Sequence, residues 1–427
     1  MQQQRTIGKS VSYTGIGLHL GKEVKVVLEP APANQGVVFV REDLPNCPSI
    51  KAMASKVVNN ERGTTIGDGI VKITTVEHIL AALSGMGIDN IVIKMNEQEF
   101  PAGDGSALPW IKLIQTAGIV TQDAPKRIFK VKSPFWIQDE DRQLVVLPDD
   151  KFKIAYTVDF PDSWIRSQFA EFVVDEKTFI EEIAPSRTFG FMREVEDLKK
   201  KGLIQGGSLK NAVVIDDNGI INEEGFRFPN EPVRHKILDL IGDLYLIGRP
   251  LKAHIIAVKT GHLFHVKLAQ KLEKLMEEEN ENKKEGFLEI RDIEKILPHR
   301  YPFLLVDRIL SMGDREIVGV KNFTVNEPFF VGHFPGHPVV PAALIIESMA
   351  QVAGVYLLSK SENQGKLAYF AGIDKARFRR PVLPGDRLVT KVKVLNLRKT
   401  TGKVEAVGTV EGKVVAEACF LFSLVEK

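Results

Sequence analysis

The sequence predicts an α+β protein of more than one domain, and three features support this prediction. The chain has 427 residues, which is more than one hydrophobic core usually organises. Hydrophobic residues make up 44% and charged residues 26%, the balance of a globular protein that can bury large cores. Runs with the alternation of strands and runs with the spacing of helices follow one another along the chain. We therefore expect two successive α+β layers and a further, smaller domain.

The first predicted domain covers residues 1–124 and surrounds one strong helix with short strands. VKVVLEP at 24–30 and NIVIKMN at 90–96 have the composition of strands. TTVEHILAALSGMG at 74–87 has the spacing of a helix, which its glycines close. The sequence APK at 124–126 marks the junction to the next domain.

The second predicted domain covers residues 125–270 and repeats the mixture of strands and helices. Its strand-like runs are RIFKVKSP, QLVVLPD and FKIAYTVDF. Its helices are expected in FGFMREVEDLKKKG at 189–202 and in VRHKILDLIGDLYLIG at 233–248. This pattern indicates a second α+β layer.

A linker is expected at residues 271–286. QKLEKLMEEENENKKEG begins as a helix and ends in a charged run with too few apolar residues to pack a core. The last domain, 287–427, begins with a helix in EIRDIEKILP, continues with the long apolar helix PAALIIESMAQVAGVYLLS and ends in four alternating strands. Its length is that of an independent domain.

Charge and hydropathy exclude several classes of partner. The formal net charge is +2 and no basic domain stands apart, so no nucleic acid is expected as a partner. The start MQQQRTIGKSVSYTG lacks a charged segment followed by an apolar core, and no run approaches the roughly 20 apolar residues of a membrane span. These features predict a cytoplasmic protein that does not span a membrane.

The two cysteines restrict the possible metal sites. Cys47 and Cys419 lie far apart, so they provide neither a disulfide framework nor a thiolate zinc site within one chain. Any metal site must therefore use histidine and carboxylate ligands.

The run VRHKILD places two such ligands on one helical face. His235 and Asp239 are four residues apart, a spacing that makes them surface neighbours on a helix. A helix whose polar side faces water is the alternative for an isolated pair of this kind. A catalytic zinc site needs a third protein ligand, and His78 in TVEHILAAL can supply it.

The residue before His78 favours hydrolysis. Two histidines and one carboxylate also form the triad of non-haem iron oxygenases, so this ligand set alone does not select the reaction. Glu77, next to His78, can act as a general base toward a metal-activated water, whereas an oxygenase does not need a free carboxylate there.

Two more histidines occur in KTGHLFHVKL. His262 follows a glycine and is the better general acid candidate, and His265 lies in the next strand-like or helical run. Asp243, one turn beyond Asp239, can bind a neighbouring imidazole and keep it protonated. A solvated surface carboxylate is the alternative for Asp243.

The motifs TVEHILAALSGMGIDN, SRTFGFM, FRFPNEPVRHKILDLIGDLYLIG and KTGH resemble those of the zinc-dependent UDP-3-O-acyl-N-acetylglucosamine deacetylases, the committed enzymes of lipid A synthesis. The resemblance covers residues 5–270. It implies that two related α+β domains form a sandwich around the active site, with one bound Zn²⁺, a UDP-sugar lipid precursor as substrate and an apolar passage for its acyl chain.

The resemblance also implies roles for individual residues. His78, His235 and Asp239 would bind zinc, Glu77 would be the base, and His262 would be the protonated acid. The remaining roles concern the transition state and the substrate. Asp243 would orient His262, Thr188 would help hold the carbonyl oxygen, Lys236 and Phe189 would contact the sugar nucleotide, and His19 in GIGLHLGK would lie near the substrate or have a structural role in its loop. Some relatives carry a cysteine upstream of TVEH, where this chain reads ERGTTIGDG, so a thiol can be neither ligand nor inhibitor here.

The last domain contains a second candidate site. In VGHFPGHPVVPAALIIESMAQ, His333 precedes a rigid Phe-Pro turn, and Glu347 lies in an otherwise apolar helix. Burial there would disfavour the charged form of the carboxyl, which makes Glu347 a functional candidate. A core glutamate that caps a backbone group is the alternative.

LPHRYPFLLVDRI, HFPGHPVVP, ESMAQ and RRPVLPGD resemble the hot-dog-fold 3-hydroxyacyl-acyl-carrier-protein dehydratases over residues 286–427. The resemblance implies a sheet wrapped around the long helix. His333 would remove the α proton, and Glu347 of a facing subunit would act on the departing hydroxyl. The domain would therefore work as a homo-oligomer, with acyl carrier protein as its partner.

Two features of the last domain leave alternatives open. The family has Pro-Gly where this chain has Pro341 and Ala342, which puts the rate in doubt rather than the reaction. Hot-dog folds also include thioesterases, and a non-catalytic oligomerisation module is a further alternative. Four basic residues around Phe378 can meet an acidic carrier protein, although solvation explains most charge runs. They are Lys375, Arg377, Arg379 and Arg380.

Overall fold

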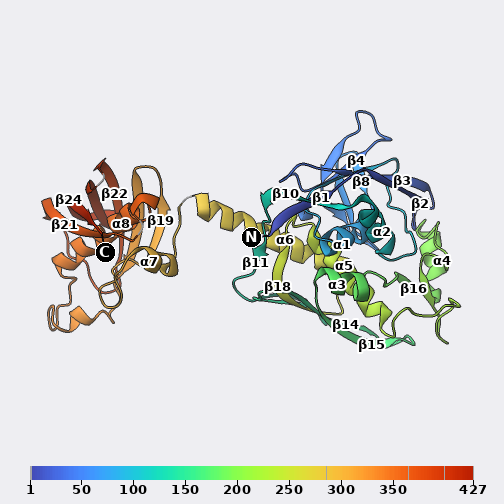
Figure 1. Ribbon diagram of the computed structural model, residues 1–427. Helices are drawn as coiled ribbons and strands as arrows, with labels where there is room; N and C mark the ends of the chain where they lie inside the picture. The colour runs from blue at the N-terminus through green and yellow to red at the C-terminus, as the bar shows by residue number, and fades with distance from the viewer. Residues whose placement is uncertain (1, 285, 364, 399, 427) are drawn as a thin grey trace. The chain divides into compact units, whose positions relative to one another are not determined.

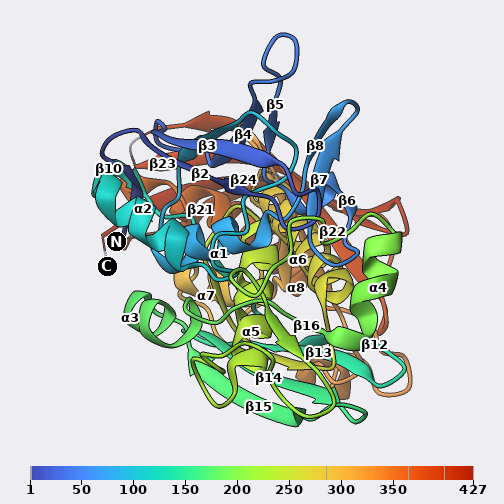
Figure 2. The same ribbon diagram turned by 90° about the vertical axis from the view of Figure 1, so that its right-hand side faces the viewer.

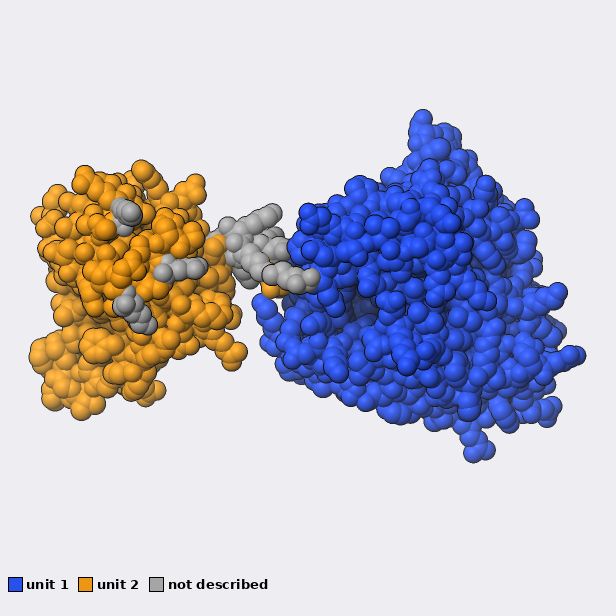
Figure 3. Space-filling model, in the orientation of Figure 1, with its two compact units in different colours: residues 1–276 blue, residues 277–427 orange. Residues whose placement is uncertain are grey.

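The computed structural model describes residues 2–284, 286–363, 365–398 and 400–426. The chain divides into two compact units, residues 1–276 and 277–427 (Figure 3). Within the described ranges, no helix is both long and apolar enough to cross a bilayer.

The first unit contains the same succession of elements twice. In each copy, four strands come first, and a helix, a fifth strand and a second helix follow. Each copy forms a five-stranded path whose third and fourth strands are parallel and whose other neighbours are antiparallel. The first copy comprises β2 (Val11–Ile16), β3 (Glu23–Pro30), β4 (Val37–Arg41), β5 (Ser49–Lys51), α1 (Glu77–Gly85), β9 (Ile91–Met95) and α2 (Leu108–Ala117). The second comprises β12 (Phe135–Asp139), β13 (Arg142–Leu147), β14 (Phe152–Phe160), β15 (Arg166–Val173), α5 (Glu231–Tyr245), β18 (Leu251–Val258) and α6 (His262–Lys284).

The two copies form a sandwich with the helices inside. Figures 1 and 2 show helices α1 and α5 between the sheet of β2–β5 and the sheet of β12–β15. Side chains from both copies belong to one hydrophobic core. This arrangement confirms the predicted α+β class and brings the first turns of α1 against α5.

Smaller elements extend each copy. Strand β11 (Phe129–Lys130) joins the second sheet beside β18. The first copy is extended by β1 (Gln3–Ile7) paired with β10 (Ile119–Pro125), and by the hairpins of β6 (Val57–Asn59), β7 (Thr65–Asp68) and β8 (Val71–Ile73). The second is extended by α3 (Glu176–Thr178), β16 (Phe189–Phe191), α4 (Met192–Lys200) and β17 (Val213–Ile215). Short helical turns lie at Ala54–Lys56, Phe179–Ile183, Pro328–Val331 and Ser361–Asn363.

Helix α5 follows from its sequence. Pro232 lies in its first turn, where a missing backbone N–H has no cost. The apolar residues of the helix are buried, and Gly248, with a φ of 69°, lies just beyond its end. The predicted helix at 233–248 is therefore confirmed, with its observed start at Glu231.

The second unit is a curved sheet around one helix. Helix α8 (Ala342–Leu358) is apolar on almost all sides and lies in the core of this unit, as expected for a helix enclosed by a sheet. The sheet order is β19-β20-β22-β23-β24-β21, with antiparallel neighbours throughout. Its elements are α7 (Ile290–Ile296), β19 (Arg308–Met312), β20 (Glu316–Asn322), β21 (Leu367–Phe378), β22 (Arg387–Leu397), β23 (Thr401–Val410) and β24 (Lys413–Val425).

Some elements differ from the sequence-based expectation. Residues 189–191 form strand β16, and only Met192–Lys200 of the predicted helix is helical. Helix α6 continues to Lys284, through most of the segment expected as a linker. Strands β19 and β20 were not predicted, whereas the four strands after α8 were.

Candidate metal centre and second site

The candidate metal site lies where α1 meets α5. The two helices approach closely because Gly242 has no side chain. A Cβ on Gly242 would lie 2.0 Å from the carbonyl oxygen of Glu77. Their contact sets the ring centroids of His78 and His235 at 5.1 Å from each other. The helical phase of α5 then places Asp239 beside both rings.

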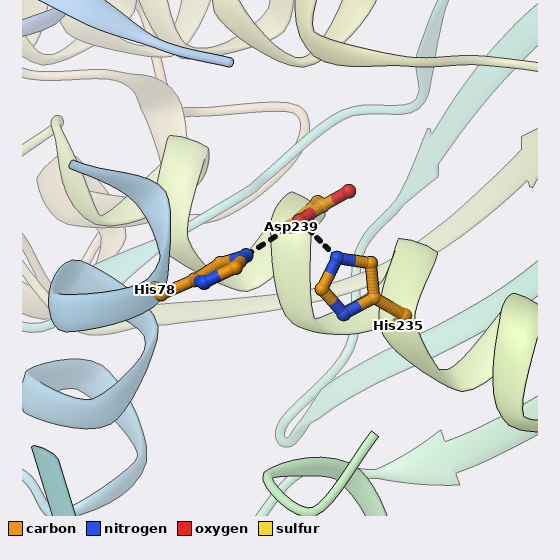
Figure 4. A group of neighbouring side chains, drawn as sticks. All are labelled: His78, His235 and Asp239. Carbon is orange, nitrogen blue, oxygen red and sulfur yellow. Dashed lines mark ion pairs between the residues drawn. The ribbon is translucent and has the colours of Figure 1, made fainter. Parts of the chain in front are cut away.

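Figure 4 shows the two imidazoles directed at the carboxylate of Asp239. Oδ1 of Asp239 lies 3.3 Å from Nε2 of His235 and 3.7 Å from Nε2 of His78. All three side chains are buried. They form a group of ligand atoms that can hold one metal ion.

The protonation states of this group suit metal binding. Burial lowers the pKa of His78 to about 3, with a further contribution from His235. Burial also lowers the pKa of His235. Burial would raise the pKa of Asp239, but electrostatic interactions with the neighbouring basic side chains, His235 and Lys236 first, hold it well below its usual value. The ligands are therefore two neutral imidazoles and a carboxylate.

The hydrogen bond on the other side of His235 fixes its tautomer. Nδ1 lies 3.0 Å from the carbonyl oxygen of Ser186, to which it donates. Nε2 of the neutral ring then carries a lone pair that faces the carboxylate oxygen of Asp239 at 3.3 Å. Two atoms that both present lone pairs to each other favour a cation between them. These side chains therefore fit a divalent metal ion.

Glu77 and His262 flank the metal ligands. Burial raises the pKa of Glu77 to about 7, and its Oε2 accepts a hydrogen bond of 2.9 Å from the backbone N–H of Thr64. Burial alone would lower the pKa of His262, but Asp243 and Asp239 outweigh this effect and raise it to about 9. Near neutral pH the site thus holds a carboxyl able to take a proton and an imidazolium able to give one.

Asp243 lies behind His262, away from the cavity. Its Oδ2 is 2.8 Å from Nδ1 of His262 and 2.9 Å from Nδ1 of His265, and its Oδ1 accepts a hydrogen bond from the hydroxyl of Thr64. Asp243 is fully buried, so the surface alternative is wrong. Burial would raise its pKa, but His262 and these hydrogen bonds hold it below its usual value.

A cavity of about 460 Å³ connects these groups. Every residue to which the resemblance gives a role in this half lines it, except Asp243, and His265 does not line it either. Lys236 donates a 3.0 Å hydrogen bond to Oδ2 of Asp239 and lies 5.9 Å from the ring centre of Phe189. Asn60, Arg62 and Arg142 also line the cavity and were not predicted, because isolated polar residues outside a motif leave no local signal.

The loop that carries Thr188 is anchored by a buried ion pair. The guanidinium of Arg187 makes two hydrogen bonds, of 2.9 and 3.0 Å, to the two carboxylate oxygens of Glu231 at the start of α5. The backbone N–H of Thr188 donates to the carbonyl oxygen of Gly105 at 2.7 Å. These contacts hold Thr188 in the wall of the cavity, which His235 also lines.

His19 also lies at the cavity. The backbone N–H groups of His19 and Leu20 each donate a 2.7 Å hydrogen bond to the carboxylate of Glu99, which holds the loop. Among the described residues, neither ring nitrogen of His19 has a hydrogen-bond partner. Both ring nitrogens of His19 are buried, although the residue lines the cavity.

The second site contains His333 and Glu347, and within one chain the two residues have different partners. Nδ1 of His333 lies 2.9 Å from the carbonyl oxygen of Val339, which leaves Nε2 unprotonated in the neutral ring. Glu347 accepts a 2.8 Å hydrogen bond from Nε2 of Gln351 and lies 3.6 Å from Nε2 of His299. Its side chain is 25% exposed, so the expectation of a buried carboxyl is wrong for the single chain.

Glu347 borders an apolar cavity. The cavity has a volume of about 220 Å³ and lies between α8 and β21. Its wall includes His299 and Gln351 and the rings of Tyr369, Phe370 and Phe422.

Ala342 is the exposed first residue of α8. The predicted basic residues around Phe378 are exposed, and Arg379 pairs with Glu417 at 2.7 Å.

Comparisons with known proteins match both units. Residues 4–274 match the family model of UDP-3-O-acyl N-acetylglycosamine deacetylases, and residues 297–419 match that of FabA-like domains. A protein of Chlorobaculum tepidum named bifunctional enzyme LpxC/FabZ is 42% identical over 99% of both chains. Its namesake in Bacteroides thetaiotaomicron is 40% identical over the full length of both.

Other relatives match single units. The UDP-3-O-acyl-N-acetylglucosamine deacetylase of Myxococcus xanthus is 46% identical over 63% of this chain and 86% of its own. A chain of the solved dehydratase heterocomplex ApeI:P from Xenorhabdus doucetiae aligns with 32% of this chain and 91% of its own, at 20% identity and a TM-score of 0.29. The family matches confirm both resemblances found in the motifs.

Proposed function

The chain belongs to the family of bifunctional LpxC/FabZ enzymes, and on this premise we propose that it carries out two reactions at two sites. Residues 1–270 remove the N-acetyl group of UDP-3-O-(3-hydroxyacyl)-N-acetylglucosamine, the committed step of lipid A biosynthesis. Residues 287–427 dehydrate (3R)-3-hydroxyacyl chains on acyl carrier protein to trans-2-enoyl chains in fatty acid elongation. Residues 271–286 join the two, and both reactions draw on the same cytoplasmic pool of 3-hydroxyacyl carriers.

Zn²⁺ is the metal of the deacetylase site, held by His78, His235 and Asp239. The observation that carries this proposal is the neutral His235, whose Nε2 faces a carboxylate oxygen at 3.3 Å. Two imidazoles and one carboxylate are a ligand set of catalytic zinc sites. When bound, such an ion acts as a Lewis acid and makes water more acidic.

Glu77 and His262 move the protons. Glu77 takes a proton from the attacking water, a task for which a pKa near 7 is suited. His262 gives its Nε2 proton to the departing amine, since Asp243 holds Nδ1 and so directs Nε2 toward the cavity. In each turnover Glu77 gains one proton and His262 loses one, and the starting state returns when Glu77 releases its proton and His262 takes one up.

The remaining cavity residues bind the substrate. Thr188 stabilises the carbonyl oxygen as charge develops on it. Lys236 and Phe189, a cation over a ring, contact the sugar nucleotide, and His19 lies within reach of the substrate. The burial of the Arg187 and Glu231 pair, which anchors the Thr188 loop, supports a preorganised site.

Single substitutions of the metal ligands test the deacetylase proposal. We expect His78→Ala, His235→Ala and Asp239→Ala to lose zinc and deacetylation and to keep the dehydratase rate, because the two sites lie in separately packed units. Zinc content and both activities are measured on the same preparations. Iron in place of zinc in the native protein would favour the oxygenase alternative, and joint loss of both activities would indicate one composite site.

In the dehydratase site, His333 removes the α proton of the thioester. The carbonyl oxygen of Val339 holds Nδ1 of its ring, which presents Nε2 as a base. Glu347, next to the apolar cavity, acts on the departing hydroxyl from the facing subunit of a dimer. Acyl carrier protein, which delivers the thioester, meets the basic residues around Phe378.

Exposed apolar surface supports the dimer. Strand β21 lies at an edge of its sheet and exposes Tyr369, Phe370 and Ile373. A long apolar edge strand is a template for pairing with another chain. Val331 and Phe334, on either side of His333, are also exposed in the single chain.

The identity of the product tests the second activity. With 3-hydroxyacyl carrier protein, we expect an enoyl thioester and no free carrier thiol. Release of the thiol would favour the thioesterase alternative. Neither product from the full chain, under conditions in which the chain deacetylates, would favour a non-catalytic oligomerisation module.

A further inference from the structure

His265 is a buried histidine with no role in the reaction described above. It lies on α6, three residues after His262, and is fully buried. Its Nδ1 is 2.9 Å from Oδ2 of Asp243, the same oxygen that lies 2.8 Å from Nδ1 of His262. One carboxylate oxygen of Asp243 therefore lies within hydrogen-bond distance of two imidazoles.

The charge of Asp243 determines where the protons lie. An ionised carboxylate only accepts hydrogen bonds, so each imidazole must present an N–H at Nδ1. The hydroxyl of Thr64 donates to the other oxygen, Oδ1. Asp243 thus receives three hydrogen bonds, which fix the plane of its carboxylate inside a fully buried site.

The opposite side of His265 is also satisfied. Its Nε2 lies 3.1 Å from the hydroxyl oxygen of Tyr156 and 3.4 Å from that of Thr260. Tyr156 donates to the carbonyl oxygen of Thr260 at 2.8 Å and accepts a 3.0 Å hydrogen bond from the Thr260 hydroxyl, so the two hydroxyl groups beside Nε2 are also bonded to each other. Burial lowers the pKa of His265, and a neutral ring with its proton on Nδ1 fits the 2.9 Å contact with the carboxylate of Asp243.

We propose that His265 is a positioning residue for deacetylation, which holds the carboxylate of Asp243 in the plane that His262 requires. His265 does not line the cavity, so it acts through Asp243. Without its hydrogen bond, the carboxylate can rotate and the Nε2 proton of His262 loses its direction toward the cavity. This inference rests on the proposed deacetylation, and it predicts an effect on turnover rather than on substrate binding.

Three substitutions at His265 separate the hydrogen bond from packing. Asparagine places an amide N–H near the position of Nδ1, whereas glutamine places its amide near Nε2 and leucine provides neither. We expect His265→Asn to keep kcat within about threefold of the native value, and His265→Gln and His265→Leu to lower kcat about tenfold or more, the usual range for such supporting groups. KM and zinc content should remain near native in all three.

The full chain supplies the controls. Dehydratase activity of each preparation shows that the chain is folded outside the first unit, and thermal unfolding reports on the first unit itself. The matched control is His254→Gln, since His254 is half-buried on β18 and does not line the cavity. If the leucine variant does not fold, kcat of the asparagine variant compared with that of the glutamine variant still shows whether the hydrogen bond from the position of Nδ1 is needed.

Each outcome has one meaning. A kcat that falls with glutamine and is retained with asparagine supports the proposal. Equal effects of asparagine and glutamine on kcat, or a change confined to KM, overturn the proposal for His265. The proposed function is unaffected by that result as long as the native chain deacetylates its substrate. A native chain that contains zinc and releases no acetate would instead overturn the proposed function.

Discussion

His235 and Asp239 lie one turn apart on helix α5, and Nε2 of His235 faces Oδ1 of Asp239 at 3.3 Å. The hydrogen bond from Nδ1 of His235 to Ser186 leaves no proton between these two atoms. The third candidate ligand, His78, comes from the equivalent helix of the other α+β copy. The site is therefore formed by the packing of one copy against the other.

We predict that Glu77→Gln keeps zinc and lowers deacetylation by about 10²- to 10⁴-fold, the usual contribution of a general base. The amide occupies the same volume and does not take a proton. Metal analysis and acetate release on the same sample measure the two effects. Full activity of the variant with native zinc content would show that Glu77 is not the general base.

The pH dependence of deacetylation should be bell-shaped. Burial raises the pKa of Glu77 to about 7, and the base must be deprotonated, so kcat/KM falls as the pH drops through that value. Asp243 and Asp239 outweigh the effect of burial and raise the pKa of His262 to about 9. The acid must be protonated, so kcat/KM falls as the pH rises through about 9.

The decline of kcat/KM at alkaline pH identifies the general acid. His262→Gln should lower kcat/KM and remove the decline above pH 9, because no imidazolium remains to lose its proton. Rates of both enzymes between about pH 5 and pH 10 provide the measurement. A decline above pH 9 that persists in the variant would assign it to another group.

Gly242→Ala should weaken metal binding from outside the site. The new Cβ would lie 2.0 Å from the carbonyl oxygen of Glu77, so α1 must move and take His78 with it. Overpacking of this kind costs about 1–3 kcal/mol of unfolding free energy. Thermal unfolding and zinc titration measure both effects.

The control for this substitution is Gly190→Ala. Gly190 has no neighbour within 4 Å of an added Cβ and no positive φ, so its replacement should leave both measurements near native. Equal behaviour of the two variants would show that the contact of α1 with α5 does not hold the metal ligands together.

Mixing two inactive dehydratase variants should restore activity. His333→Ala and Glu347→Ala each remove one half of a site that two subunits share. A heterodimer of the two contains one intact site, and therefore at most about half of the native sites under two-fold symmetry. The enoyl product measures recovery after mixing and re-equilibration, and no recovery would place both residues in the site of a single chain.

The sequence predicted those parts of the site that depend on local spacing. The four-residue interval of His235 and Asp239 placed both on one face of a predicted helix, and the helix and the pair were both found. The neighbouring Glu77 and His78 begin α1, within the predicted helix at 74–87. The motifs then identified both families, which the comparisons confirmed.

The contacts that support the site could not be predicted in this way. Thr64 binds Asp243 across 179 positions of the chain, and such pairs leave no periodic signal. The role of His265 depends on where helix α6 directs its side chain. From the sequence alone, the run that contains His265 could be a strand or a helix. Residues 189–191 have a helical context in sequence but pair with β17, since tertiary pairing outweighs local preference there.

Removal of the metal shows whether one chain has a metal-dependent deacetylase and an independent dehydratase. The native chain is stripped by a chelator, and both activities are measured before stripping, after it and after Zn²⁺ is returned. We expect deacetylation to disappear and to return with about one zinc per chain, as expected for a single three-ligand site, while dehydration stays constant throughout. Deacetylation that survives the loss of all metal, or dehydration that falls and returns together with it, would contradict the account.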